Sequence, residues 1–139
     1  TRLHDLGVQP FLTAATILGV LAQRLVRRLC PLCKQETAIN EQEWGHLTFD
    51  YVMDMPTMMY KAVGCEACRH TGYKGRVGIY EFMPVSLELK SIISAHGTLN
   101  DLKAQAKKEG VEPLRIAGAR KVIEGATTLE EVLRVVPLS

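Results

Sequence analysis

Two matched pairs of cysteines constrain the fold of this chain more than any other feature. Cys30 and Cys33 are separated by two residues, and Cys65 and Cys68 repeat that spacing further along. A Cys-x2-Cys turn brings two thiolates to one point, so two such turns can complete a tetrahedron around zinc, with Zn–S distances of about 2.3 Å. A site with all four positions filled by protein is structural rather than catalytic. The spacing therefore predicts a structural Zn²⁺ that closes the segment 30–68.

Other uses of four cysteines stay open on spacing alone. Two disulfides are typical of secreted domains, but this chain is not rich in cysteine, and its hydrophobic content of 47% can build a core. A redox pair usually occurs once, whereas an iron–sulfur cluster also takes four thiolates. His70 lies two residues after Cys68 and could replace one cysteine as a ligand. With four cysteines available, we expect it to contact solvent or to form a hydrogen bond instead. Lys34 and Arg69 follow the two pairs and would offset thiolate charge.

After an entry loop at residues 1–9, residues 10–29 are expected to form one long helix. From Pro10 to Leu29 the apolar residues recur at helical spacing, and Arg24, Arg27 and Arg28 fall on the opposite side. Near a helix end these arginines suit the helix dipole, which favours a solvated, cap-stabilising role over a subunit or anion contact. The apolar run 11–22 is shorter than the roughly 20 residues that a membrane span needs.

Beyond the first cysteine pair, the pattern predicts short elements. A capping box at 40–43 predicts a helix, and β-rich stretches predict strands at 60–63 and 76–85, with a turn at 73–75 between them. Four helices are expected to begin after Ser86, Thr98, Pro113 and Thr128. Four methionines are expected to fill gaps in the core rather than form a partner groove: Met53, Met55, Met58 and Met59.

No signature of catalysis is found in the sequence. It has no phosphate-binding loop, no dinucleotide-binding glycine motif and no zinc-protease motif. The net charge of +2, from 17 basic and 15 acidic residues, predicts neither a nucleic-acid partner nor an acidic tail. Because the chain starts at Thr1, we expect it to be cut from something larger. The residues alone thus predict an α+β module, closed by zinc, with a helical appendix and no active site.

Four stretches together resemble a known family. In order they are TRLHDLGVQPFL, LGVLAQRLVRRLCPLCK, GCEACRHTGYKGRVGIYEFMPVS and GATTLEEVLRVV. They resemble the C-terminal region of the bacterial type II secretion and type IV pilus assembly ATPases, which are built on RecA-like cores. The resemblance covers nearly the whole chain. The leucine-rich first segment and the cysteine insertion look closer to the type II secretion branch than to the pilus retraction ATPases, which lack that insertion.

The resemblance implies a division of the chain and a role for some residues. The implied parts are the end of a RecA-like ATPase domain (1–29), a zinc-binding subdomain (30–75), a returning strand (76–85) and a C-terminal helical subdomain (86–139). The four cysteines match the metal ligands of the family. Four further residues match its "QR" and "GR…E" signatures: Gln23, Arg24, Arg76 and Glu81. Arg76 and Glu81 are expected either to pair with each other or to contact a neighbouring subunit.

The resemblance also implies what the parent protein does. It would be a cytoplasmic hexameric ATPase, with ATP and Mg²⁺ bound upstream of this fragment, so the parent is an enzyme and the fragment alone is not. It would dock on inner-membrane platform proteins and power type II secretion by assembling a pseudopilus. The alternatives are a type IV pilus assembly ATPase and a zinc ribbon that binds nucleic acid. The last would use basic residues and one stacking ring after the second cysteine pair: Arg69, His70, Lys74, Arg76 and Tyr73.

Overall fold

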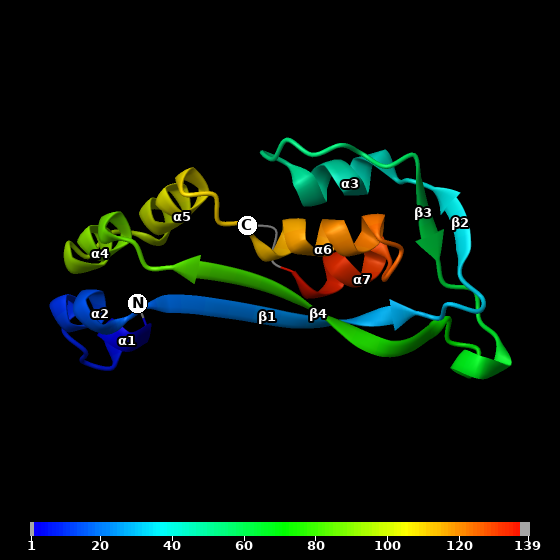
Figure 1. Ribbon diagram of the computed structural model, residues 1–139, viewed down its shortest axis with the longest axis horizontal. Helices are drawn as coiled ribbons and strands as arrows, with labels where there is room; N and C mark the ends of the chain where they lie inside the picture. Colours follow the sequence, from blue (N-terminus) through cyan, green and yellow to red (C-terminus); the bar gives the residue numbers. More distant parts are fainter. Residues whose placement is uncertain (1, 137–139) are drawn as a thin grey trace. The chain divides into compact units, whose positions relative to one another are not determined.

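The computed structural model describes residues 2–136 of the chain, which mix helices and strands (Figure 1). In chain order the elements are α1 (Arg2–Asp5), α2 (Pro10–Thr16), β1 (Gly19–Leu29), β2 (Gln35–Ala38), α3 (Glu41–Thr48), β3 (Met58–Lys61), η1 (Glu66–Cys68), β4 (Tyr73–Pro84), α4 (Leu87–Ser94), α5 (Leu99–Lys108), α6 (Leu114–Ile123) and α7 (Leu129–Val135). The α+β class is confirmed.

The chain divides into two compact units, each made of two segments that are far apart in the sequence. Unit 1 comprises Thr1–Ala22 and Glu81–Glu112, and unit 2 comprises Gln23–Tyr80 and Pro113–Ser139. The division therefore cuts across the ranges 1–29 and 86–139 that the resemblance implies.

The long helix expected up to Leu29 is wrong, because α2 ends at Thr16 and residues 19–29 form strand β1. β1 pairs with β4. The two ends of this ladder are bracketed by the bonds from Val85 N to Leu18 O and from Cys30 N to Gly72 O, so the strands are antiparallel. Val26 and Leu29 are the buried residues of β1. Their spacing of three residues is also that of a helix face. The residues form a strand instead, because they pair with β4, which lies more than forty residues further along the chain.

The segment between the cysteine pairs forms a small sheet and one helix. β2 and β3 are antiparallel, in a register from Gln35 opposite Lys61 to Ala38 opposite Met58, with α3 between them in sequence. The pattern predicted α3 and β3 but not β2, which is short and mostly polar. The turn expected at 73–75 is instead the start of β4, where Gly75 alone keeps a turn-like φ of 79°.

The expected helices after residue 86 are confirmed, with their predicted caps. The hydroxyls of Ser86, Thr98 and Thr128 each accept a hydrogen bond from the backbone N–H three residues later, and Asn40 caps α3 in the same way. Pro113 precedes α6. Within residues 2–136, none of the helices has both the length and the apolar character needed to cross a membrane.

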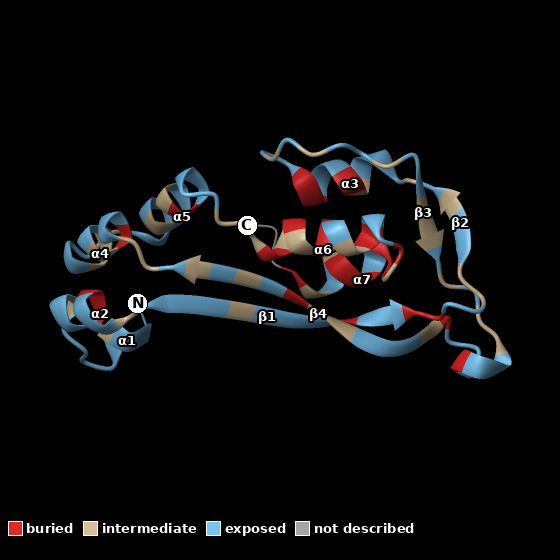
Figure 2. Cartoon of the chain, viewed as in Figure 1, coloured by how far each residue is buried: buried red, intermediate tan, exposed pale blue. Residues whose placement is uncertain are grey.

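The buried core of unit 2 lies among α3, α6, α7 and the strands (Figure 2). Trp44 and Leu47 of α3 are buried, as are Ile116 of α6 and Val132 of α7. A Cβ at Gly118 of α6 would collide with Val132, so the glycine permits a close approach of α6 and α7. In unit 1, α2 packs on α4 and α4 on α5, and the buried apolar residues are Ala14, Leu89 and Ala106.

The expectation that the methionines fill the core is wrong. Met55 and Met58 are exposed, and Met53 and Met59 are only half-buried. Three of these residues lie in or next to the irregular connection between α3 and β3. That connection has no helical or strand period, so its sequence carries no signal for which side chains face inward.

Candidate metal centre

The four cysteines converge on one point. Cys30 follows β1, Cys33 precedes β2, Cys65 precedes η1 and Cys68 is the last residue of η1. Their Sγ atoms all lie within 4.8 Å of one another. Three Sγ–Sγ separations are 3.8 Å: Cys30 to Cys65, Cys33 to Cys68, and Cys65 to Cys68. A regular tetrahedron with Zn–S bonds of about 2.3 Å has edges of about 3.8 Å, so the four thiols can hold a metal ion such as zinc.

The same geometry argues against the disulfide alternative. All four cysteines are free thiols, and 3.8 Å is far beyond the roughly 2.05 Å of an S–S bond. His70, the possible substitute ligand, is exposed and does not belong to the group of four ligand atoms. The distances suit an iron–sulfur cluster less well, because its cysteine sulfurs bind different iron atoms and lie further apart.

Backbone amides support the sulfur atoms. The N–H of Gly64 donates to Sγ of Cys33 at 3.3 Å, and the N–H groups of Cys65 and Gly72 both donate to Sγ of Cys68 at 3.2 Å. Gly72 has a φ of 83°, and a Cβ there would collide with Ala62. Only glycine therefore fits at this donor position without displacing the neighbouring chain.

The charge balance of the cluster calls for a cation. Burial would raise the pKa of the Cys68 thiol, but the N–H groups of Cys65 and Gly72 outweigh burial and lower the pKa to about 6. At Cys33 the N–H of Gly64 lowers the pKa, yet burial and the neighbouring thiols raise it to about 11. Four thiols at these distances cannot all lose their protons unless a metal ion neutralises part of the resulting negative charge.

Lys34, expected to offset thiolate charge, is engaged elsewhere. Its Nζ donates to the carbonyl of Gly125 at 2.9 Å and lies 4.5 Å from the centre of the Tyr60 ring. The carbonyl of Gly125 belongs to the turn between α6 and α7. The lysine therefore connects the first cysteine pair to the turn between α6 and α7. The positive partial charges near the sulfur atoms come from backbone N–H groups instead.

The turn that Lys34 contacts is part of a larger attachment, residues 125–131, which we name the latch. The N–H of Leu29 donates to Ala126 O at 2.9 Å, and the Thr127 hydroxyl donates to Arg27 O at 2.8 Å. These bonds flank Cys30 on its N-terminal side, as the Lys34 bond flanks it on the other. The latch thus holds the end of β1 directly beside the cysteine cluster.

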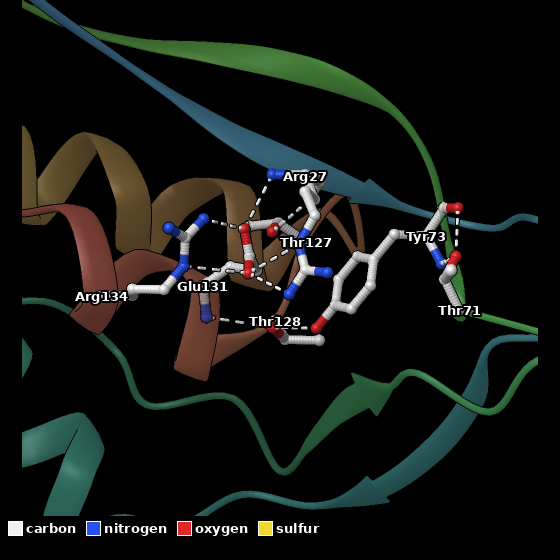
Figure 3. Close-up of polar contacts among 7 residues, drawn as sticks. All are labelled: Arg27, Thr71, Tyr73, Thr127, Thr128, Glu131 and Arg134. Carbon is white, nitrogen blue, oxygen red and sulfur yellow. Dashed lines mark hydrogen bonds and ion pairs between the residues drawn. The ribbon is translucent and has the colours of Figure 1, made fainter.

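Glu131 anchors the latch (Figure 3). Its side chain is 3% exposed and accepts hydrogen bonds from Arg27 Nε at 3.0 Å, Arg27 Nη2 at 2.7 Å and the Arg27 backbone N–H at 2.9 Å. Arg134 adds an ion pair at 3.0 Å. Burial would raise the pKa of Glu131, but the hydrogen bonds from Arg27 and Arg134 outweigh it and lower the pKa to about 2. The carboxylate therefore stays ionised although it is buried.

Tyr73 completes this arrangement (Figure 3). Its ring lies under the Arg27 guanidinium, with 4.2 Å between the Cζ atom and the ring centre, and its hydroxyl is 2.9 Å from the Thr128 hydroxyl. Tyr73 was the stacking residue of the nucleic-acid alternative, and these contacts engage it within the protein. The four basic side chains of that alternative are exposed: Arg69, His70, Lys74 and Arg76.

Sequence reasoning missed the latch. It treated Arg27 as a solvated helix residue, whereas Arg27 lies on a strand and its carboxylate partner, Glu131, is 104 residues away. A signal was present: Glu131 falls at helical spacing with Thr128 and Val132, on the buried face of α7. A carboxylate on such a face requires a cationic partner, since burying it unpaired is costly.

The remaining signature residues lie on β1 and β4. Gln23 and Arg24 are exposed on β1, where Arg24 Nη1 donates to the carbonyl of Gln23 at 2.8 Å. Arg76 is exposed on β4, and its expected pairing with Glu81 or with a neighbouring subunit stays a prediction.

Comparison with known proteins places the chain in a family. The family described as "Type II/IV secretion system protein" matches residues 1–134. The chain is 67% identical over its full length to a type IV pilus assembly ATPase, TfpB, of Acinetobacter baylyi, covering 24% of that protein. It is 44% identical over 97% of its length to type II secretion system protein E of Pseudomonas aeruginosa, covering 26% of that protein. Type II secretion system ATPase E of Vibrio cholerae is 41% identical, with the same coverages.

The chain spans about a quarter of the length of these curated relatives. Members from both the secretion and the pilus branches match nearly all of it, in agreement with the resemblance carried by its four sequence motifs. The chain therefore belongs to the type II/IV secretion system protein family and corresponds to a region of a secretion or pilus assembly ATPase.

Proposed function

We propose that this chain is the C-terminal structural and docking part of a cytoplasmic hexameric assembly ATPase. The parent binds ATP and Mg²⁺ in its preceding RecA-like portion and works at the inner membrane through platform proteins. The observation that carries the proposal is the four-thiol cluster, whose geometry fits a closed tetrahedral ion and leaves no position for substrate. A closed site of this kind supports structure, not chemistry.

The residues around the cluster define what the module does. A Zn²⁺ held by Cys30, Cys33, Cys65 and Cys68 would supply one rigid cross-link between the ends of the insertion. The chain itself supplies the rest: the N–H groups of Gly64 and Gly72 orient two sulfurs, and Glu131 holds β1 against the latch. The insertion, residues 30–68, is thus attached rigidly. When the motor domain moves, the insertion and any docking surface on it move with it.

The finer assignment is type II secretion, in which the ATPase powers assembly of a pseudopilus. The leucine-rich first segment and the cysteine insertion support this assignment against a pilus retraction ATPase, though not against a pilus assembly ATPase. A second candidate is type IV pilus assembly, favoured by the identity of 67% to the Acinetobacter baylyi pilus ATPase against 44% to the Pseudomonas aeruginosa secretion protein.

An exchange experiment separates the two branches. The matching region of the Acinetobacter baylyi pilus ATPase, and separately that of the Pseudomonas aeruginosa secretion protein, is replaced by this chain in the full-length protein. If the parent powers secretion, the second chimera restores export of a secreted reporter, while the first fails to assemble surface pili; the pilus candidate predicts the reverse. The control is each chimera carrying Cys33→Ser and Cys65→Ser.

The same chimeras test the module itself. Failure of both, with the proteins present at normal levels and hexameric by size-exclusion chromatography, would contradict an interchangeable docking module. Full activity of a chimera that lacks residues 30–68 would contradict it as well, because the insertion would then contribute nothing.

A further inference from the structure

The cysteine cluster has a buried half and an accessible half. Cys30 is 0% exposed and Cys68 is 5% exposed, whereas Cys33 and Cys65 are only half-buried. A chelator that removes a bound metal replaces the thiolates one after another, and it reaches the half-buried pair first. The ion is freed completely only when the two buried sulfurs detach as well. Movement of the chain around these two sulfurs therefore decides how fast the metal leaves.

Cys30 is held by hydrogen bonds on both of its backbone groups. Its N–H donates to the carbonyl of Gly72 at 2.9 Å, and its carbonyl accepts from the N–H of Lys34 at 3.1 Å. The preceding residue, Leu29, donates its N–H to the carbonyl of Ala126 in the latch. The sulfur of Cys30 therefore cannot move far from a bound ion unless the end of β1 moves with it.

The latch binds the chain on both sides of the first cysteine pair. On the N-terminal side, the Thr127 hydroxyl and the Glu131 carboxylate both bind Arg27. On the C-terminal side, the side chain of Lys34 donates to the carbonyl of Gly125. Because one segment holds both ends of the pair, a large movement of the pair requires the latch to open.

The second cysteine pair is connected to the same segment. The N–H of Gly72 donates to Sγ of Cys68. The next residue, Tyr73, stacks its ring against the Arg27 guanidinium and places its hydroxyl 2.9 Å from that of Thr128. Opening of the latch therefore weakens the support of both buried sulfurs at once.

Glu131 determines how often the latch opens (Figure 3). Its buried carboxylate forms ion pairs with Arg27 at 2.7 Å and with Arg134 at 3.0 Å. Separating a buried carboxylate from its cationic partner costs more than breaking a hydrogen bond between neutral groups. Glutamine at this position keeps the shape of the side chain and removes its charge, so a latch with glutamine should open more often.

We propose that the latch controls release of the metal. The ion leaves when the pair of Arg27 and Glu131 has opened, and Glu131 acts as a positioning residue for Cys30 through the last residues of β1. This inference goes beyond the proposed function, because it concerns the lifetime of the bound metal and not the docking of the module. It rests on that proposal in one respect, which is that the four thiols hold zinc.

The rate of metal release from the zinc-loaded chain tests the proposal. Elemental analysis first gives the zinc content, and an excess of the coloured chelator pyridylazoresorcinol then measures the release. We expect a rate that becomes independent of chelator concentration, because opening of the latch precedes attack. Glu131→Gln should release zinc about tenfold faster, and Glu130→Gln, at the exposed neighbouring carboxylate, should leave the rate unchanged. Cadmium NMR should give the same four-thiolate signal for both variants, which separates faster exchange from a lost ligand.

Further variants separate the latch from overall stability. Leu47 is buried in α3, outside the latch, and Leu47→Ala should destabilise unit 2 at least as much as Glu131→Gln without faster release. Urea denaturation measures both losses of stability. Thr127→Val removes the hydroxyl that donates to Arg27 and should speed release, whereas Thr127→Ser keeps that hydroxyl and should restore the native rate. The threonine variants keep the test possible if Glu131→Gln does not fold.

Two results would overturn the proposal and leave the metal centre intact. One is an equal rate of release from the native chain and from the latch variants. The other is an equally fast release from Leu47→Ala, which would mean that release follows unfolding of unit 2 as a whole. A chain that binds no metal would overturn the metal centre together with this inference, and the zinc content distinguishes that failure from the other two.

Discussion

Unit 1 and unit 2 both contain helices, but their interiors are very different. Unit 2 buries a contiguous set of large side chains from α3, α6 and α7, and it carries both the cysteine cluster and the latch. Unit 1 buries Ala14, Leu89 and Ala106, while Phe11 and Leu18 are among the large apolar residues that it exposes. Because burial of apolar area dominates stability, unit 2 should be the more stable part of the chain. Helices alone do not decide where stability lies.

Removal of the metal is expected to have the largest effect on this difference. We expect one zinc per chain, and four thiols that react only after chelation, because structural zinc contributes about 10 kcal/mol or more in small sites. Hydrogen exchange, followed separately in the two units, should show loss of protection in unit 2 on chelation and little change in unit 1. Two disulfides and no metal would break the argument for the cluster.

Glu131→Gln is expected to have the next largest effect. It leaves Arg27 without its anionic partner, and we expect unit 2 to lose about 2 kcal/mol, less than for a fully buried pair because Arg27 is half-exposed. Urea denaturation of the zinc-loaded chain measures the loss. The matched control is Glu130→Gln, at the neighbouring exposed carboxylate. Equal destabilisation by both variants would show that the latch is not specific.

The pH dependence of the same pair gives a finer comparison. The pKa of Glu131 is about 2 in the folded chain, against an ordinary value of 4.5, so its contribution to stability is complete above pH 4.5. As the pH falls from 4.5 towards 2, the unfolded state takes up a proton first and the contribution is lost. The free energies of unfolding of the native chain and of Glu131→Gln should therefore converge over this range. A constant difference would contradict the lowered pKa.

The smallest expected effect is in unit 1. The hydroxyl of Thr98 accepts a hydrogen bond from the Asp101 N–H and so caps α5, and the carboxylate of Asp101 accepts one from the Thr98 N–H. Thr98→Ala should cost about 1 kcal/mol, measured as faster amide exchange confined to α5, and Thr98→Ser should restore protection. Loss of protection that also reaches α6 or α7 would mean that the units are not separate in stability.

Local chemistry decided which features the sequence predicted. Capping residues act within one turn of a helix, so the starts of α3 to α7 were predicted closely. The repeated Cys-x2-Cys spacing indicated which four thiols lie together. β1 was mistaken for a helix because its hydrogen-bond partner, β4, lies far along the chain, and Val26 and Leu29 happen to share helical spacing. The Arg27–Glu131 pair and the exposed methionines were missed for the same reason: both depend on tertiary contacts.

The distances along the chain between bonded groups set an order for synthesis. The first cysteine pair meets the second across 35 residues, from Cys30 to Cys65, whereas Arg27 waits for Glu131 across 104. A ribosome adds roughly 5–20 residues per second. The four thiols are therefore together several seconds before the carboxylate of the latch exists. During that interval a bound ion and the pairing of β1 with β4 would together constrain the end of β1, so the supply of metal during translation should affect how much of the chain reaches its folded state.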